Sequence, residues 1–305
     1  MITIFEDNKF VSLAENFDYV TAKANGKPMV FIPIFGPYNV GKSSTIKKIT
    51  LDTNILESDG FLETRSGTNI YGPYPYNEIR KRFDMEDVED GETQVFFFDT
   101  NPTGPYGKTS IFEEKSYIDQ LVAPCIALSS VIIFMIRPNN SVHEIEVIRR
   151  IFQAIKSIRQ DMRIIILVTN IPKYRPKQGK FEKYQKKLMK VFVPRFGEDF
   201  KTADFIPLPY EFNQSEYDEG FKIFVQHLMN HIEETRRDFV LDQQSASDIF
   251  KSITSKADDQ LLTELAQHVI AEAKRAAEER LKLRKNKHLY VSIYLILCGL
   301  RRCLY

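Results

Sequence analysis

The octapeptide GPYNVGKS at residues 36–43 constrains this chain more than any other feature, because it is a complete G-x-x-x-x-G-K-S phosphate-binding loop. An apolar run at 29–35 precedes it and suits a buried strand, while residues 42–50 suit a helix. Glycines at 36 and 41 permit a tight turn whose N–H groups face an anion at the positive end of that helix. The sequence therefore predicts a site for a chain of phosphates.

The side chains of this loop and of a second motif have expected roles in holding a nucleotide. Lys42 would neutralise the β- and γ-phosphates, and the hydroxyl of Ser43 would hold Mg²⁺. The run QVFFFD ends in Asp99, an acidic residue in the position expected to orient the hydrated Mg²⁺. The residues expected to contact nucleotide are Gly36, Tyr38, Asn39, Val40, Gly41, Lys42, Ser43, Ser44, Asp99 and Asn170.

Composition places the chain among ordinary globular proteins of the cell interior. Its 305 residues, 43% hydrophobic and 27% charged, suffice for one large α/β domain and a helical appendage. A formal net charge of +1 gives no overall field that would attract nucleic acid, so we expect no nucleic-acid partner. Three cysteines without a C-x-x-C pair, and an N-terminus without a basic, apolar leader, favour a cytoplasmic protein.

Short apolar runs alternate with stretches of helical period, which is typical of an α/β fold. Pro33 removes a backbone donor from the first of these runs, so we expect a local irregularity in that strand. Together with the phosphate loop, the pattern predicts a three-layer P-loop NTPase fold over residues 1–240, with a mostly parallel sheet. We expect strands at 29–35, 94–99, 131–136, 163–169 and 204–208, and helices at 42–50, 113–127, 141–159, 180–192 and 217–236.

Residues 241–305 are expected to form a helical extension. Apolar residues at helical spacing favour a long amphipathic helix at 255–287, which either packs on the domain or makes a coiled-coil contact. The apolar stretch 289–300 is shorter than the roughly 20 residues needed to span a bilayer, and basic residues flank it. Simple packing and peripheral membrane contact through the C-terminus are the alternatives for this stretch.

A polar segment between the two nucleotide motifs, ETRSGTNIY at 63–71, has the composition of a mobile loop that could close over a γ-phosphate. Thr68 is the hydroxyl expected to complete the ligands of Mg²⁺ with Ser43 and Asp99, and Thr64 competes for that role.

At these motifs the sequence resembles the large GTPases of the guanylate-binding protein and atlastin type, within the dynamin superfamily. GPYNVGKS is similar to that family's G-x-Y-R-T-G-K-S and shares Tyr38. RSGT at 65–68 is similar to its switch I, FDT at 98–100 to the start of its switch II, and IALSSVIIF to its A-L-S-S strand. The resemblance covers about residues 28–235.

The resemblance implies GTP and GDP as ligands and Mg²⁺-dependent hydrolysis of GTP. Within it, Ser66 would help to position the attacking water, and Lys42 and Thr68 would act on the transferred phosphoryl group. It also implies a homodimer that forms across the nucleotide face.

The sequence departs from the family pattern where catalysis and base recognition are concerned. Asn39 stands where the family has an arginine that acts on the transition state, so we expect slow hydrolysis. Pro102 stands where switch II has a glycine, and no aspartate follows the strand at 163–169 to accept the protons of guanine. Asn170 could still bond the base. A nucleotide-binding scaffold with little turnover and a P-loop ATPase therefore remain alternatives to a GTPase.

Two further patterns have a structural and a functional interpretation. His227 and His231 stand at i and i+4 of a predicted helix and could bind a metal, although exposed polar positions are the simpler interpretation. Lysines crowd residues 173–190 with tyrosines between them, which resembles a nucleic-acid or phospholipid patch, although a solvated helix face is commoner.

Overall fold

The computed structural model of the protein describes residues 2–5, 13–37, 39–55, 68–89, 92–100, 123–139, 142–159, 162–171, 174–176, 180–209, 214–236 and 241–254. Several predictions fall outside these residues. They concern Tyr38, Thr64, Ser66, Pro102 and the segment 255–305.

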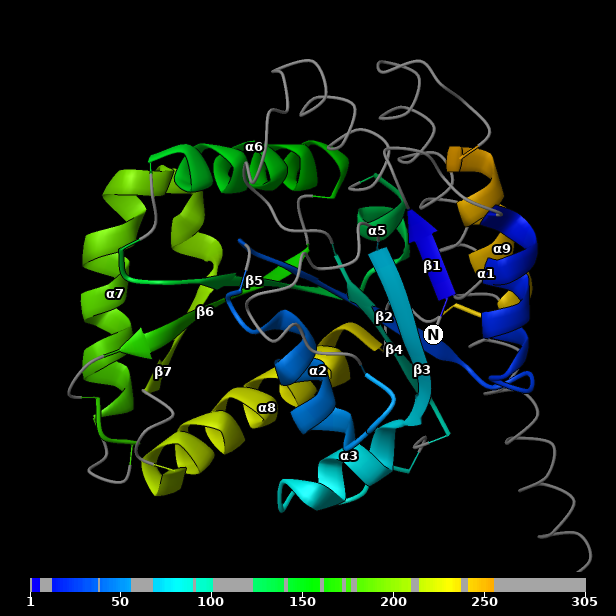
Figure 1. The fold of residues 1–305 in the computed structure, drawn as a ribbon, viewed down its shortest axis with the longest axis horizontal. Helices are drawn as coiled ribbons and strands as arrows, with labels where there is room; N and C mark the ends of the chain where they lie inside the picture. The colour runs from blue at the N-terminus through cyan, green and yellow to red at the C-terminus, as the bar shows by residue number, and fades with distance from the viewer. Residues whose placement is uncertain are drawn as a thin grey trace, which may run out of the picture.

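A seven-stranded sheet forms the centre of the molecule (Figure 1). The spatial order is β1-β3-β4-β2-β5-β6-β7. From β4 to β7 neighbouring strands are parallel, whereas β3 is antiparallel to both of its neighbours. The strands are β1 (Ile2–Phe5), β2 (Met29–Phe35), β3 (Thr68–Pro75), β4 (Gln94–Asp99), β5 (Val131–Ile136), β6 (Arg163–Ile171) and β7 (Asp204–Pro209). Because the parallel strands share one direction, their carboxyl ends lie along one edge of the sheet.

Helices cover both faces of this sheet, which gives three layers (Figure 1). One buried cluster joins the sheet to α1, α5, α6, α7 and α9, and the other joins it to α2, α3 and α8. The described helices are α1 (Leu13–Ala22), α2 (Lys42–Thr50), α3 (Tyr76–Arg82), α5 (Ala123–Leu128), α6 (Val142–Ile158), α7 (Phe181–Phe196), α8 (Gln214–Arg236), α9 (Gln243–Thr254) and the 3-10 helix η3 (Glu198–Thr202).

The central strands are buried on both faces, which explains why the sequence predicted them. In β2, Phe31 and Phe35 pack in one cluster, and Ile32 and Ile34 pack in the other. Every residue of β4 and β5 is likewise buried. A strand enclosed on both sides becomes a continuous apolar run, and such runs predicted β2, β4, β5, β6 and β7 correctly.

The expected irregularity at Pro33 is present at the contact between β2 and β5. Phe31 bridges to Ser129, and Ile34 then pairs with Ile133. The segment before β5 therefore contributes one residue more than β2 does between these two contacts. A bulge of this kind accommodates a residue that has no N–H to donate.

The strand β3 corrects the prediction that residues 63–71 form a loop, because residues 68–71 are part of a strand. Asn69 pairs with Asp99 and Ile70 with Phe98, next to the central strands. The sequence did not reveal this strand because Gly72 and Pro73 interrupt it, and both residue types are depleted in strands. Long-range pairing with β4 and β1 overrides that local preference.

The helix α9 packs on the same domain as the sheet. Phe250 stacks on Phe17 of α1 with a centroid distance of 4.3 Å and an interplanar angle of 1°. Leu241, just before α9, exchanges backbone hydrogen bonds with Met29 at the start of β2. The described part of the predicted C-terminal extension is therefore joined to β2 at its first residue, at the end of the strand away from residues 36–43. Among the helices described, none is long and apolar enough to cross a membrane.

The predicted histidine pair belongs to a polar cluster around Asp204, at the start of β7. Its carboxylate lies 3.0 Å from His231 Nε2 and 3.5 Å from His227 Nδ1, and Gln185 Nε2 donates to it at 2.6 Å. Hydrogen bonds from the two histidines hold the pKa of Asp204 well below its usual range, against the effect of burial. The cluster ties β7 to α7 and α8. Within the described ranges, no group of three or more His, Cys, Asp or Glu side chains could hold a metal ion.

We predict that Asp204→Asn lowers the free energy of unfolding by about 1–3 kcal/mol at pH 6, because hydrogen bonds to a charged group are lost. The contribution of a carboxylate with a depressed pKa is complete above about pH 4, the pKa of an unfolded aspartate, and is lost as the pH falls further. Urea unfolding between pH 3 and pH 6 should therefore show the two proteins converging at low pH. Asp248→Asn, at an exposed position on α9, is the control. A constant difference across this range would contradict the assignment.

Candidate functional site

The phosphate-binding loop lies at the carboxyl end of β2, between that strand and α2 (Figure 1). Because β2 is flanked by β4 and β5, residues that end those strands approach the loop from either side. Asp99 is the last residue of β4, and Arg137 directly follows β5. This is the edge of the sheet at which parallel α/β folds bind ligands.

The backbone of the loop explains its two glycines. Gly41 has φ 98°, in the left-handed region that favours glycine, and it is the N-cap of α2. A Cβ on Gly36 would lie 2.5 Å from the carbonyl oxygen of Met135 in β5, so only glycine fits there without movement. Asn39 also adopts a positive φ, 53°, which asparagine tolerates better than most residues. Chain conformation and close packing therefore both fix the loop.

Lys42 lies across the loop and bonds to its carbonyl groups. Its Nζ donates to Gly36 O at 3.0 Å and to Pro37 O at 3.1 Å, and the residue is only 8% exposed. Burial lowers the pKa of Lys42 to about 8, and the negative charge of Asp99 opposes that shift. The ammonium group thus has neutral hydrogen-bond partners inside the protein. An anion that entered the loop would stabilise its positive charge.

Ser43 and Asp99 form a pair of oxygen ligands beside this lysine. Ser43 Oγ donates to Asp99 Oδ2 at 2.6 Å. Burial raises the pKa of Asp99, while Lys42 and the hydrogen bond from Ser43 act in the opposite direction. A hydroxyl and a carboxylate in contact are hard oxygen donors of the kind that Mg²⁺ prefers. The residues present therefore fit the predicted metal.

The strand register also brings Thr68 to this end of the sheet. Thr68 is the first residue of β3, and the next residue, Asn69, pairs with Asp99. On the other side of Asp99, Thr100 Oγ1 donates to Ile34 O in β2 at 2.7 Å. This bond fixes the residue after Asp99 against the strand that leads into the loop.

Arg137 is a residue of the site that the sequence analysis missed. Its Nη2 donates to the carbonyl oxygen of Asn39 in the loop. A guanidinium group from the end of β5 therefore holds the loop at the residue with the left-handed conformation. The available signal was a charged residue directly after the apolar run VIIFMI, at the carboxyl end of a predicted parallel strand.

Of the remaining predicted contacts, Val40 and Asn170 are only partly as expected. The side chain of Val40 is 6% exposed and packs in the core, so only its backbone faces the loop. Asn170 is half-buried at the end of β6 with φ 58°. Thr169 Oγ1 donates to Ile136 O at 3.2 Å, which joins β6 and β5 where Asn170 stands. Asn170 thus lies near the same edge of the sheet as the phosphate-binding loop.

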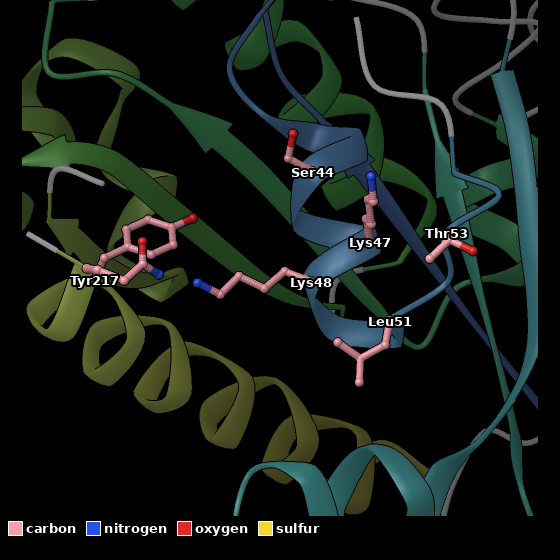
Figure 2. A pocket seen from close by; sticks show the side chains of 7 residues that line it. Ser44, Lys47, Lys48, Leu51, Thr53 and Tyr217 are labelled. Atoms are coloured by element: carbon pink, nitrogen blue, oxygen red, sulfur yellow. The ribbon is translucent and has the colours of Figure 1, made fainter. Parts of the chain in front are cut away.

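A cavity of about 450 Å³ opens beside α2 (Figure 2). Ser44, the neighbour of Ser43, lines one end of it, and Leu51 lines it near the end of the helix. Lys48 extends from α2 toward α8, where its Nζ lies 4.2 Å from the ring centre of Tyr217 and 2.5 Å from Asp218 Oδ1. The other residues of the lining are Lys47, Thr53 and Gln214.

The fold class follows from the order of the strands, the loop after β2 and the contact between Ser43 and Asp99. The domain has the P-loop NTPase fold. Gly36, Gly41, Lys42 and Ser43 of the loop lie beside Asp99, which comes from a strand much later in the sequence.

Two solved structures show a distant likeness to the chain. No protein-family model and no curated protein matches it. The G domain of the FeoB iron transporter of T. maritima is 14% identical, with a TM-score of 0.36, over 68% of this chain and 99% of that chain. A dimerization-deficient mutant of Toc33 from Arabidopsis thaliana is 12% identical, with a TM-score of 0.41, over 73% and 91% of the two chains. Likeness at this distance assigns no function.

Proposed function

We propose that this protein binds a guanine nucleoside triphosphate together with Mg²⁺ and slowly hydrolyses its β–γ bond. The observation that carries the proposal is the buried ammonium group of Lys42, bonded only to loop carbonyls in the contacts described, beside the Ser43–Asp99 pair. A buried cation without a hydrogen-bonded carboxylate is unfavourable unless an anion joins it.

The loop would bind the phosphate chain by exchanging internal partners for ligand oxygens. Lys42 would transfer its donors from Gly36 O and Pro37 O to the β- and γ-phosphates, with charge-assisted bonds replacing neutral ones. The first N–H groups of α2 have no partners within the helix and point toward the same position. Since Lys42 is buried, little water screens its attraction for the phosphates.

Ser43 and Asp99 would hold the metal, with Thr68 as the third residue from this chain. When bound, Mg²⁺ would neutralise charge that develops between the β- and γ-phosphates. Ser43 would then give up its hydrogen bond to Asp99, and both oxygen atoms would face the ion. Ser66 would orient the attacking water, as the resemblance in its segment implies.

We expect slow turnover because Asn39 stands where the resembling GTPases have an arginine. Asn39 carries no charge, and arginine groups that act on the transition state accelerate related reactions by about 10³- to 10⁵-fold. Arg137 approaches the same residue, but it donates to the backbone carbonyl of Asn39. We therefore assign Arg137 the role of a positioning residue that stabilises the loop.

Guanine preference rests on the resemblance to guanylate-binding and atlastin-type GTPases. Asn170 is the candidate for a contact with the base, and the absence of an aspartate in residues 165–173 makes ATP the second candidate nucleotide. A cytoplasmic location and a homodimer across the nucleotide face are further parts of the proposal that come from the sequence.

We predict that the wild-type protein binds labelled GTP in the presence of Mg²⁺ and that Lys42→Ala weakens binding at least about tenfold, because charge-assisted hydrogen bonds are lost. Fluorescence titration with GTP, GDP and ATP, with and without Mg²⁺, measures this. Lys81→Ala, at an exposed position on α3, is the matched control and should bind as the wild type does. Equal affinity of Lys42→Ala and wild type would exclude the loop as the binding site, and stronger binding of ATP would select the second candidate.

The depressed pKa of Lys42 predicts the pH dependence of that affinity. Lys42 is protonated below about pH 8 in the free protein, and bound phosphates would raise its pKa, so binding takes up a proton above pH 8. Wild-type affinity for the triphosphate should be level below pH 8 and fall by up to about tenfold per pH unit above it. Lys42→Arg retains a permanent charge and should lack this fall. An identical decline in both proteins would refute the role of Lys42.

A further inference from the structure

Helix α7 carries a stripe of lysines on the side opposite the core. Lys183, Lys186, Lys187 and Lys190, which we call the lysine stripe, are all exposed and follow the i, i+3, i+4, i+7 pattern of one helix face. Leu188, Phe192 and Phe196 fix the opposite face in the core. The stripe is therefore held in place by packing and points outward by necessity.

Among the described residues, the lysine stripe lacks the carboxylate partners that several other surface lysines have. Within the described part of the chain, none of its four members forms an ion pair, and Lys187 only lies over the Tyr184 ring at 5.0 Å. Five exposed or half-exposed lysines elsewhere in the described ranges do have carboxylate partners, whereas Lys23 lies over the Tyr19 ring at 4.6 Å. These pairs are Lys48–Asp218, Lys81–Asp87, Lys201–Glu198, Lys222–Asp84 and Lys251–Asp18.

The like charges of the lysine stripe repel one another and destabilise α7. Each lysine of the stripe has another lysine three or four positions away, and like charges at that spacing destabilise a helix. An ordinary solvated face would intersperse several carboxylates, whereas Glu182 is the single acidic residue of α7. A surface that presents many negative charges to α7 would remove this repulsion.

We propose that the lysine stripe is a contact surface for an anionic lipid bilayer. Lysine ammonium groups are compact point charges that suit a diffuse layer of headgroups, and each is worth roughly a fivefold gain in membrane partitioning. Val191, 52% exposed, and the exposed Pro194 lie on the same outer side of α7 and supply a small apolar contact. The outer side of α7 thus presents four positive charges and two exposed apolar residues.

The composition of the stripe favours lipid over nucleic acid. It contains no arginine for bidentate contacts to bases. The neighbouring aromatic ring, Tyr184, packs against Tyr174 at 4.9 Å and lies under Lys187, so it offers no free face on which a base could stack.

The position of α7 is compatible with function at the nucleotide loop. It lies at the outer edge of the molecule beside β7, whereas α2 and the loop lie at the centre of the sheet (Figure 1). A bilayer against the lysine stripe would leave the loop accessible to nucleotide. The proposal is independent of the proposed nucleotide hydrolysis.

The test is sedimentation of the full chain with vesicles of phosphatidylcholine alone or with added phosphatidylserine. We expect binding only to the anionic vesicles, weakening as salt shortens the Debye length. Replacing all four stripe lysines by glutamine should weaken binding by at least about tenfold, and replacing them by arginine should retain it. Since both changes lie on an exposed face, unfolding curves check that each variant remains folded.

Two controls and one competing partner complete the experiment. Glutamine at Lys23, Lys81, Lys201 and Lys251 changes the net charge equally at exposed positions elsewhere and should leave binding unchanged. The double variant Ile293→Asp, Leu297→Asp makes the C-terminal segment less apolar. In this variant, replacing the stripe lysines by glutamine should still weaken binding to anionic vesicles. Equal loss in the control set, or loss in the C-terminal variant alone, would overturn the proposal. So would a stripe variant that loses binding to a short RNA but not to vesicles.

Discussion

The structure depends on how one buried positive charge is accommodated. Lys42 is enclosed by the loop that it belongs to and bonds to the carbonyls of Gly36 and Pro37, with Asp99 as its nearby counter-charge. The same carboxylate accepts a hydrogen bond from Ser43. Phosphate oxygens and a cation would give the ammonium group and the carboxylate charged partners in place of neutral ones. The loop therefore gathers one cation and two oxygen ligands where a phosphate chain and a metal ion would bind.

The sheet supplies the geometry that this exchange requires. β2 leads into the loop from the centre, β4 delivers Asp99 on one side, and β5 delivers Arg137 on the other. The contact of Gly36 with Met135 O and the hydrogen bond from Thr100 to Ile34 keep these strand ends close. Leu241, just before α9, secures the opposite end of β2 through backbone hydrogen bonds with Met29. The rigid elements around the loop thus determine where its few polar groups meet, which is the condition for a precise binding site.

The sequence predicted those parts of the protein that carry a strong local signal. Apolar runs predicted the parallel strands because burial on both faces leaves no polar positions. The glycine spacing of the loop predicted Lys42 and Ser43, and the acidic end of the run QVFFFD predicted Asp99. β3 escaped prediction because its stability comes from pairing with distant strands across Gly72 and Pro73. Arg137 escaped because a single charged residue after a strand gains meaning only when that strand is known to lie beside the loop. The contacts of His227 and His231 with Asp204 were missed for the same reason.

The most direct test of this account is a crystal structure of the protein with Mg²⁺ and a non-hydrolysable GTP analogue. The account predicts that Lys42 Nζ leaves Gly36 O and Pro37 O for the β- and γ-phosphates, and that Ser43 Oγ turns from Asp99 to the metal. A nucleotide bound elsewhere, with Lys42 still bonded to the loop carbonyls and Ser43 still bonded to Asp99, would contradict it.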